Sequence, residues 1–205
     1  MNDNFYIQDY CHIKNHQLKL NGKVIFEDDR NNNLKEFLKN SYKSQKINYS
    51  KFFKMDNLSK MTFLAAEIIL KNIALQELNN NIALVFSNNA ASLDTDRKFQ
   101  NSISDSDNFY PSPAVFVYTL PNIGIGEISI RHQLKSENAF FVFENYNAKF
   151  HQNYENVLLR SNISDAVLGG WVNVDEENYE AFVYLVSRKG NIEHTNKNLI
   201  KLYKD

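Results

Sequence analysis

Five consecutive apolar residues, 82–86, constrain the fold of this chain more than any other feature. A strand with one solvated face alternates apolar and polar residues, whereas this run is apolar throughout, which is typical of a strand covered on both faces. Just before it, apolar side chains recur every three or four residues from Leu58 to Leu78, which predicts a helix with an apolar stripe. A helix leading into a doubly covered strand favours an α/β fold.

The rest of the chain continues the alternation of strands and helices. An Asn21-Gly22 pair between two apolar runs predicts a β-hairpin. Further segments are expected as follows: strand 139–143, helix 147–159, strands 166–174 and 181–186, and a last strand or short helix over 194–203. We therefore predict one α/β domain, residues 1–205, with a mixed, mainly parallel five-stranded sheet packed by helices and an antiparallel pair at its edge.

Residues 113–134 form an unusual stretch that is apolar on nearly every side. A helix of this kind must be buried within its domain or against a partner. Pro121 is expected to interrupt the helix, and Gly124 and Gly126 leave room for another backbone. Glu127 needs a partner in such surroundings, and Arg131, four residues on, is the expected one.

Composition excludes several classes of function. The 23 basic and 24 acidic residues give a net charge of −1, so no bulk charge favours nucleic acid or an anionic membrane. No apolar run reaches the roughly 18 residues that span a bilayer. The N-terminus lacks the basic and apolar regions of a secretory signal. We expect a cytoplasmic protein.

No pattern of ligands predicts a metal or cofactor. Gly124-x-Gly126 lacks the third glycine of a dinucleotide fingerprint, and His12 and His16 lie in a predicted strand, where their spacing does not pair them. Asp94 and Asp96 are expected to cap a loop or pair with Arg97 or Lys98. The remaining histidines are isolated in sequence and are interpreted as surface or hydrogen-bonded residues: His132, His151 and His194.

The order of these elements and several strings resemble the N-terminal half of β-ketoacyl-acyl carrier protein synthases, whose fold is thiolase-like. The strings are 64–67 with Leu70, 84–88, 92–96, 112–116, 119–122 and 165–170. Residues 118–123, 126–128 and 130–132 are similar to short synthase-like proteins of Bacteroidetes type associated with aryl-polyene or flexirubin pathways.

The resemblance implies that the chain cannot condense acyl groups alone. The family's nucleophilic cysteine follows the strand that matches 139–143, where Glu144 and Asn145 stand here. Neither an amide nor a carboxylate can form the acyl-thioester intermediate. The family's histidines belong to a C-terminal half, and this chain corresponds to the first half alone. Cys11, the one cysteine, lies far from this position and is interpreted as a small buried apolar residue.

We therefore predict a non-catalytic, chain-length-factor-like subunit that pairs with an active ketosynthase in fatty-acid or aryl-polyene biosynthesis. It would form a homodimer or a heterodimer, with acyl carrier protein as a possible further partner. The acyl-tunnel or interface candidates are Phe116, Tyr118, Thr119, Pro121, Asn122, Glu127 and Arg131. Two alternatives stay open: an active 3-oxoacyl synthase or acyltransferase that uses Cys11, and a module that binds acyl chains or acyl carrier protein. Pathway and acyl-chain length stay undetermined.

Overall fold

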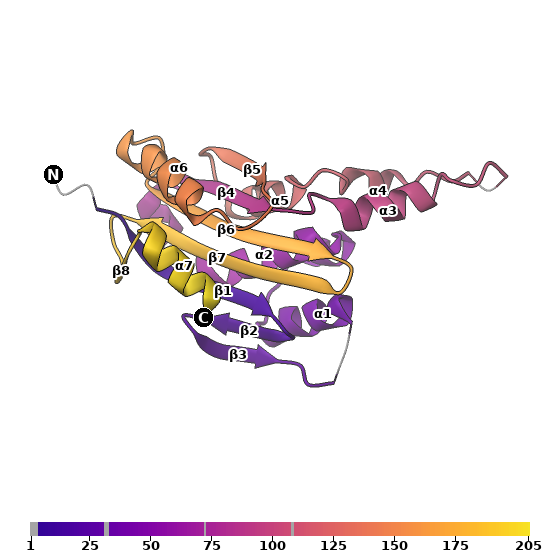
Figure 1. Ribbon diagram of the computed structural model, residues 1–205, viewed down its shortest axis with the longest axis horizontal. Helices are drawn as coiled ribbons and strands as arrows, with labels where there is room; N and C mark the ends of the chain where they lie inside the picture. Colours follow the sequence, from indigo (N-terminus) through magenta and orange to yellow (C-terminus); the bar gives the residue numbers. More distant parts are fainter. Residues whose placement is uncertain (1–3, 31–32, 72, 108) are drawn as a thin grey trace.

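A mixed sheet packed by helices on both faces forms the core of the molecule (Figure 1). The computed structural model describes residues 4–30, 33–71, 73–107 and 109–205. Asn72, inside the helix predicted over 58–78, lies outside the described residues. The strands are β1 (Tyr6–Lys14), β2 (Gln17–Leu20), β3 (Lys23–Glu27), β4 (Ile82–Asn88), β5 (Asn138–Val142), β6 (Ala166–Asp175), β7 (Asn178–Ser187) and β8 (Ile192–Glu193). Their order is β3-β2-β1-β7-β6-β4-β5, with β8 paired to β1.

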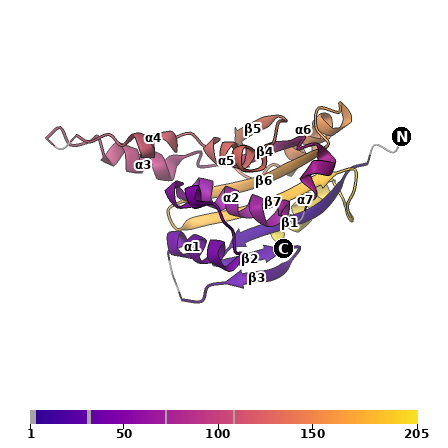
Figure 2. The same cartoon turned by 180° about the vertical axis from the view of Figure 1, so that it is seen from behind.

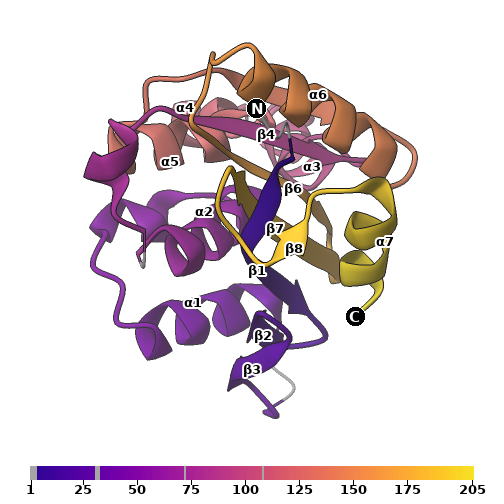
Figure 3. The same ribbon diagram turned by 90° about the vertical axis from the view of Figure 1, so that its left-hand side faces the viewer.

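The helices form two layers on the sheet and one projecting arm (Figure 1). They are α1 (Leu34–Ser44), η1 (Ser50–Lys54), α2 (Asn57–Leu70), η2 (Leu75–Leu78), α3 (Leu93–Asn101), α4 (Pro113–Val117), α5 (Ile123–His132), α6 (Ala148–Arg160) and α7 (Asn196–Lys204). Seen along the sheet, α1, α2 and α5 cover one face while α6 and α7 cover the other (Figure 3). None of the helices in the described ranges is long and apolar enough to cross a membrane.

Strand β4 shows why the sheet is covered twice. Its seven residues are all buried. Because successive side chains point to opposite faces, Ile82, Leu84 and Phe86 enter the core under α2, while Ala83 and Val85 enter the core under α6 and α7. The prediction of a strand buried on both faces is confirmed.

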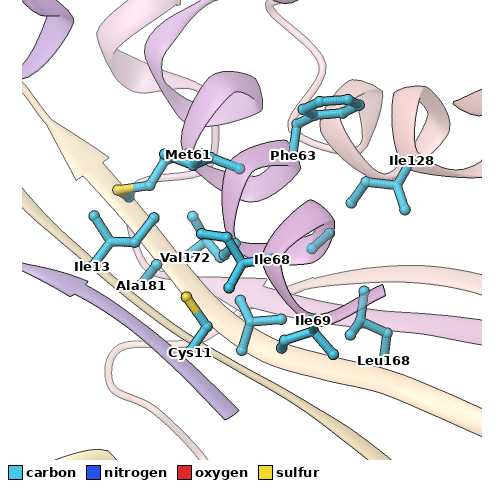
Figure 4. Packing of buried hydrophobic residues seen from close by; sticks show 14 of the residues in the cluster. Cys11, Ile13, Met61, Phe63, Ile68, Ile69, Ile128, Leu168, Val172 and Ala181 are labelled. Carbon is cyan, nitrogen blue, oxygen red and sulfur yellow. The ribbon is translucent and has the colours of Figure 1, made fainter. Parts of the chain in front are cut away.

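Helix α2 is the centre of the larger core. Asp56 caps its first turn by accepting a hydrogen bond from the Ser59 amide at 2.9 Å. Every residue from Leu58 to Leu70 is buried, so the helix is enclosed rather than striped. Figure 4 shows Ile68 and Ile69 of α2 packed toward the strands below. The long helix predicted to Leu78 ends at Leu70, and η2 follows separately.

The first hairpin is confirmed. β2 and β3 pair in antiparallel fashion across Asn21 and Gly22, both with positive φ (51° and 76°). Two positive φ values are what a type I′ hairpin turn requires, and an Asn-Gly pair adopts them most readily.

The prediction of an α/β fold with a mixed sheet is confirmed, but its detail differs. The sheet has eight strands among the described residues, not five, and only two of its seven strand pairs, β4–β5 and β4–β6, are parallel. The β6–β7 hairpin lies between β1 and β4 rather than at an edge. The tight turns of the β1–β3 meander and of β6–β7 impose antiparallel pairing that helix-strand alternation does not reveal.

The apolar stretch 113–134 forms two helices. Residues 118–122 interrupt it around Pro121, as predicted. Helix α5 is partly buried, with Gly124 against Ser59 and Thr62 of α2. Helix α4 buries none of its five residues within the chain, so of the two expectations only burial against a partner is left for it. Figures 1 and 2 show why: α3 and α4 form an arm that projects away from the sheet.

Candidate functional site

The turn between β5 and α6 holds the position that the resemblance assigns to a nucleophile. Glu144 and Asn145 both lie in this turn, and both are exposed. Asn147 follows as the cap of α6 and accepts a hydrogen bond from the Phe150 amide at 3.0 Å. The strand-turn-helix arrangement predicted here is present, with an exposed carboxylate and an exposed amide where a nucleophile would stand.

The interface candidates on the arm surround an exposed apolar surface. Phe116 is 56% exposed and rests against Phe99 of α3, with ring centroids 5.3 Å apart. Ser92 donates a 2.6 Å hydrogen bond to the Thr119 carbonyl, which ties the arm to the loop after β4. Tyr118, unlike Phe116, packs against the larger core, which is centred on α2.

Apolar side chains gather on this side of the molecule. Eight of the large exposed apolar residues belong to the arm, to α5 or to β5: Leu93, Phe109, Tyr110, Phe116, Val117, Leu120, Ile130 and Val142. We call this set the apolar arm surface. Exposed apolar groups in such number usually mark a contact with another molecule.

The edge of the sheet lies next to the apolar arm surface. β5 pairs only with β4 among the described strands, so its other edge is free to bond. A hollow of about 270 Å³ opens beside it, lined by Pro121, Asn122, Ile125, Gly126, Asn138 and Phe140. The structure thus brings two of the predicted interface residues to the edge strand.

Glu127 and Arg131 each pair with another residue of this chain, and the ion pair predicted between them does not form. Glu127 is buried, lies 2.7 Å from Lys51 Nζ and accepts a hydrogen bond from the Tyr49 hydroxyl at 3.1 Å. Arg131 Nε instead lies 3.5 Å from Glu67 Oε1. The reason is the η1 turn, which places Lys51 and Tyr49 against α5.

A buried polar cluster, which we call the Glu155 cluster, lies between α6, α7 and the sheet. Glu155 is fully buried; its Oε1 lies 2.9 Å from His151 Nδ1 and accepts a hydrogen bond from the Tyr184 hydroxyl at 3.0 Å. Its Oε2 lies 2.9 Å from His194 Nε2. Ser87 of β4 lies 2.7 Å from His151 Nε2. His151 and His194 are hydrogen-bonded, as interpreted, but the sequence did not indicate that the fold joins them on one carboxylate.

Protonation in the Glu155 cluster follows from this geometry. An ionised Glu155 can only accept, so His151 Nδ1 donates to it, and the Ser87 hydroxyl lies at the other ring nitrogen, Nε2. Burial alone would raise the pKa of Glu155, but contacts with His151 and His194 outweigh it and hold that pKa below its ordinary value. Burial raises the pKa of Tyr184. Glu155 is therefore an ion stabilised by its neighbours.

The cluster has the residue types of a catalytic Ser-His-Glu triad, but a substrate has no access to it. Ser87, His151 and Glu155 are each 0% exposed, so a substrate cannot reach the hydroxyl while α6 lies on the sheet. The arrangement fixes helices instead of attacking a bond. Sequence reasoning missed it, although His151 and Glu155 stand four residues apart on a predicted helix, a spacing at which side chains meet.

Cys11 and the other candidates behave as structural groups. Cys11 is fully buried among α2 and strand residues (Figure 4), on the face of the sheet opposite α6. Burial raises its pKa above the ordinary thiol value, which suppresses the thiolate. Asp94 pairs with Lys98 at 2.6 Å, as predicted. The described residues contain no group of His, Cys, Asp and Glu arranged to hold a metal ion.

Comparison with known proteins defines the fold. The chain is similar to the structure described as the ishigamide ketosynthase/chain length factor, with TM-score 0.67 and 12% identity over 90% of this chain and 62% of that one. A type II polyketide acyl-carrier protein in complex with its ketosynthase gives TM-score 0.65 and 11% identity, over 92% and 64% of the two chains. The chain therefore has the thiolase-like fold of the ketosynthases and chain length factors, and spans less than two thirds of these two chains.

A third similar structure matches nearly end to end. It is a ketosynthase in complex with its chain length factor from Xenorhabdus doucetiae, with TM-score 0.60 and 11% identity. The match covers 98% of this chain and 90% of that one, so the two are close in length. No family model and no curated protein matches the sequence.

Proposed function

We propose that this chain is a chain-length-factor-like subunit that pairs with an active ketosynthase. The observation that carries the proposal is the thiolase-like fold combined with Glu144 and Asn145 exposed in the turn where the resemblance puts a nucleophilic cysteine. A carboxylate or an amide at that turn cannot hold an acyl group as a thioester. We propose that the whole chain, residues 1–205, acts as one domain.

The apolar arm surface and the β5 edge are the proposed contact with the ketosynthase. A free strand edge offers backbone hydrogen bonds to a second strand, and the apolar residues beside it offer area to bury. Phe116 and the hollow lined by Pro121 and Asn122 lie at this contact. Glu127 and Arg131 stabilise this contact surface through ion pairs within the chain, which bind η1 and α2 to α5.

The buried face of α6 does not need a partner. In the Glu155 cluster, α7 lies over the sheet beside α6, and Leu199 and Leu202 fill the core there. The exposed apolar residues concentrate on the arm and not on the helices that cover this face. This difference favours a heterodimer joined through the arm and β5 over a stacking of two halves through α6.

The proposed setting is polyketide or aryl-polyene biosynthesis in the cytoplasm, with acyl carrier protein as the donor to the complex. The pathway rests on the resemblance of residues 118–132 and on the similar structures, whose descriptions name ketosynthases, chain length factors and an acyl-carrier protein. A reducing compartment suits a chain whose one cysteine is buried and unpaired.

Reconstitution tests the proposal. A ketosynthase of the type II class is assayed with malonyl- and starter-loaded carrier protein, with and without the chain. We expect condensation to need both, and the chain alone to give none. Condensation by this chain alone, lost in Cys11→Ser, would instead support the enzymatic alternative. A ketosynthase whose rate and product lengths are the same without the chain would contradict the proposal.

A further inference from the structure

A second cavity, of about 340 Å³, lies where α2 begins, on the face of the sheet opposite the Glu155 cluster. Side chains from five elements line it: α1, η1, α2, α3 and α4. Its lining residues comprise a basic group, an apolar group and three further polar residues, Asp56, Asn57 and Thr95. The basic residues are Lys35, Lys54, Lys60 and Lys98.

Lys60 is the unusual member of this set. It lies in the first part of α2 and is only 8% exposed, yet it makes no hydrogen bond or ion pair with any described residue. The aliphatic stem of Lys60 is buried while its ammonium group reaches the cavity, so the charge is only partly removed from water. A ligand in the cavity could therefore pair with it directly.

The one nearby carboxylate is already engaged. Asp56 Oδ1 accepts the capping hydrogen bond from the Ser59 amide at 2.9 Å, and its Oδ2 accepts a hydrogen bond from the Thr95 hydroxyl at 2.7 Å. Lys98 pairs with Asp94 at 2.6 Å and so carries its own counter-ion. Lys60 forms no direct ion pair with a described residue, and Asp56 offsets its charge only in part.

Electrostatics around the cavity favours an anion. Burial, and then the like charge of Lys35, lowers the pKa of Lys60, which records how poorly its positive charge is compensated. Lys35 and Lys54 are exposed at the rim. The first turn of α2 adds its own partial positive charge and unpaired amides.

The opposite wall of the cavity is apolar. It consists of Met55 after η1, Ala114 and Val115 of α4, and the ring of Tyr118. A fully hydrated inorganic ion would leave this wall unused. We propose that the cavity binds a phosphate monoester that carries a short apolar group, with the phosphate on Lys60 and the apolar group against Val115 and Tyr118. This inference does not depend on pairing with a ketosynthase.

Titration calorimetry with hexyl phosphate as the probe tests the inference. We expect saturable binding to the whole chain, weakened about tenfold or more in Lys60→Met. Lys60→Met should fold, because it keeps an apolar stem of similar length in the buried position and removes only the ammonium group. Lys201→Met, a lysine exposed on α7, is the matched control and should bind as the wild type does.

Two further probes separate the charge from the apolar group. Hexanol and inorganic phosphate should each bind more weakly than hexyl phosphate. Equal binding by hexanol would overturn the role of Lys60, and equal binding by inorganic phosphate would overturn the role of the apolar wall. Should Lys60→Met not fold, Val115→Glu puts a negative charge at the cavity and must weaken binding; unchanged affinity there, or no binding of hexyl phosphate by the wild type, would overturn the proposal.

Discussion

Gly169 of β6 lies directly against the carboxylate of Glu155 on α6. A methyl group at Gly169 would overlap Glu155 Oε1 and press on the ring of Tyr184 at 3.1 Å. The missing side chain therefore makes room for the acid that joins His151, His194 and Tyr184.

Gly169→Ala is expected to destabilise the fold by about 1–3 kcal/mol, the usual cost of overpacking a closed core. Gly126 of α5 is the matched control, since a methyl group there meets nothing within 4 Å. Gly126→Ala should raise the free energy of unfolding by about 0.5–1 kcal/mol through helix propensity alone. Urea unfolding of both variants checks the contrast, and a Gly169→Ala variant as stable as the wild type would contradict the packing described here.

Stability should fall in acid because of Glu155. Its folded pKa is lower than the unfolded value of about 4.3, so the folded state holds the ion more firmly than the unfolded chain does. The resulting stabilisation is fully present above the unfolded pKa and is lost as the pH falls through the folded pKa. Unfolding by urea between neutral pH and acid measures this dependence.

Glu155→Gln separates this acid from the others. The variant should lose about 3–5 kcal/mol at neutral pH, because it removes one partner of a buried ionic group. Its stability should then depend less on pH than that of the wild type in the acid range. Parallel pH profiles for the two proteins would show that Glu155 does not contribute to the acid sensitivity.

Cys11 should resist thiol reagents in the folded protein. It is fully buried and its pKa is raised by that burial, so little thiolate is available and none of it is accessible. We expect iodoacetamide to label Cys11 only after unfolding, at the rate of global opening. Rapid labelling of the native protein, particularly by an acyl thioester analogue, would favour the enzymatic alternative.

Two exposed valines test the proposed contact surface. Val142 at the end of β5 is 53% exposed, and Val157 on α6 is 59% exposed. Val142→Lys puts a charge on the edge strand and should weaken binding to the ketosynthase, while Val157→Lys should leave it unchanged. Analytical ultracentrifugation of each variant with the ketosynthase measures the difference. Equal effects of the two substitutions would place the contact elsewhere.

The parts of the fold that depend on local sequence patterns could be predicted. The Asn21-Gly22 hairpin, the doubly covered strand at 82–86 and the break at Pro121 all follow from backbone preference or periodicity, and all are present. The position of the β6–β7 hairpin could not be read in this way, because strand order depends on which distant strands pair.

Polar contacts between elements distant in sequence could not be predicted either. Glu127 was expected to bind Arg131, its neighbour on the helix, but η1 brings Lys51 from 76 residues away. His151 and Glu155 carry a local signal, whereas Ser87 and His194 reach the same carboxylate only through the tertiary fold. Pairings between elements distant in sequence are set by packing, and a single sequence does not display them.

Native mass spectrometry of this chain co-expressed with a ketosynthase tests whether the two proteins pair. We expect a complex containing both polypeptides in equal number, which dissociates when Val142 is replaced by lysine. A spectrum in which this chain remains a monomer beside a homodimeric ketosynthase would contradict it.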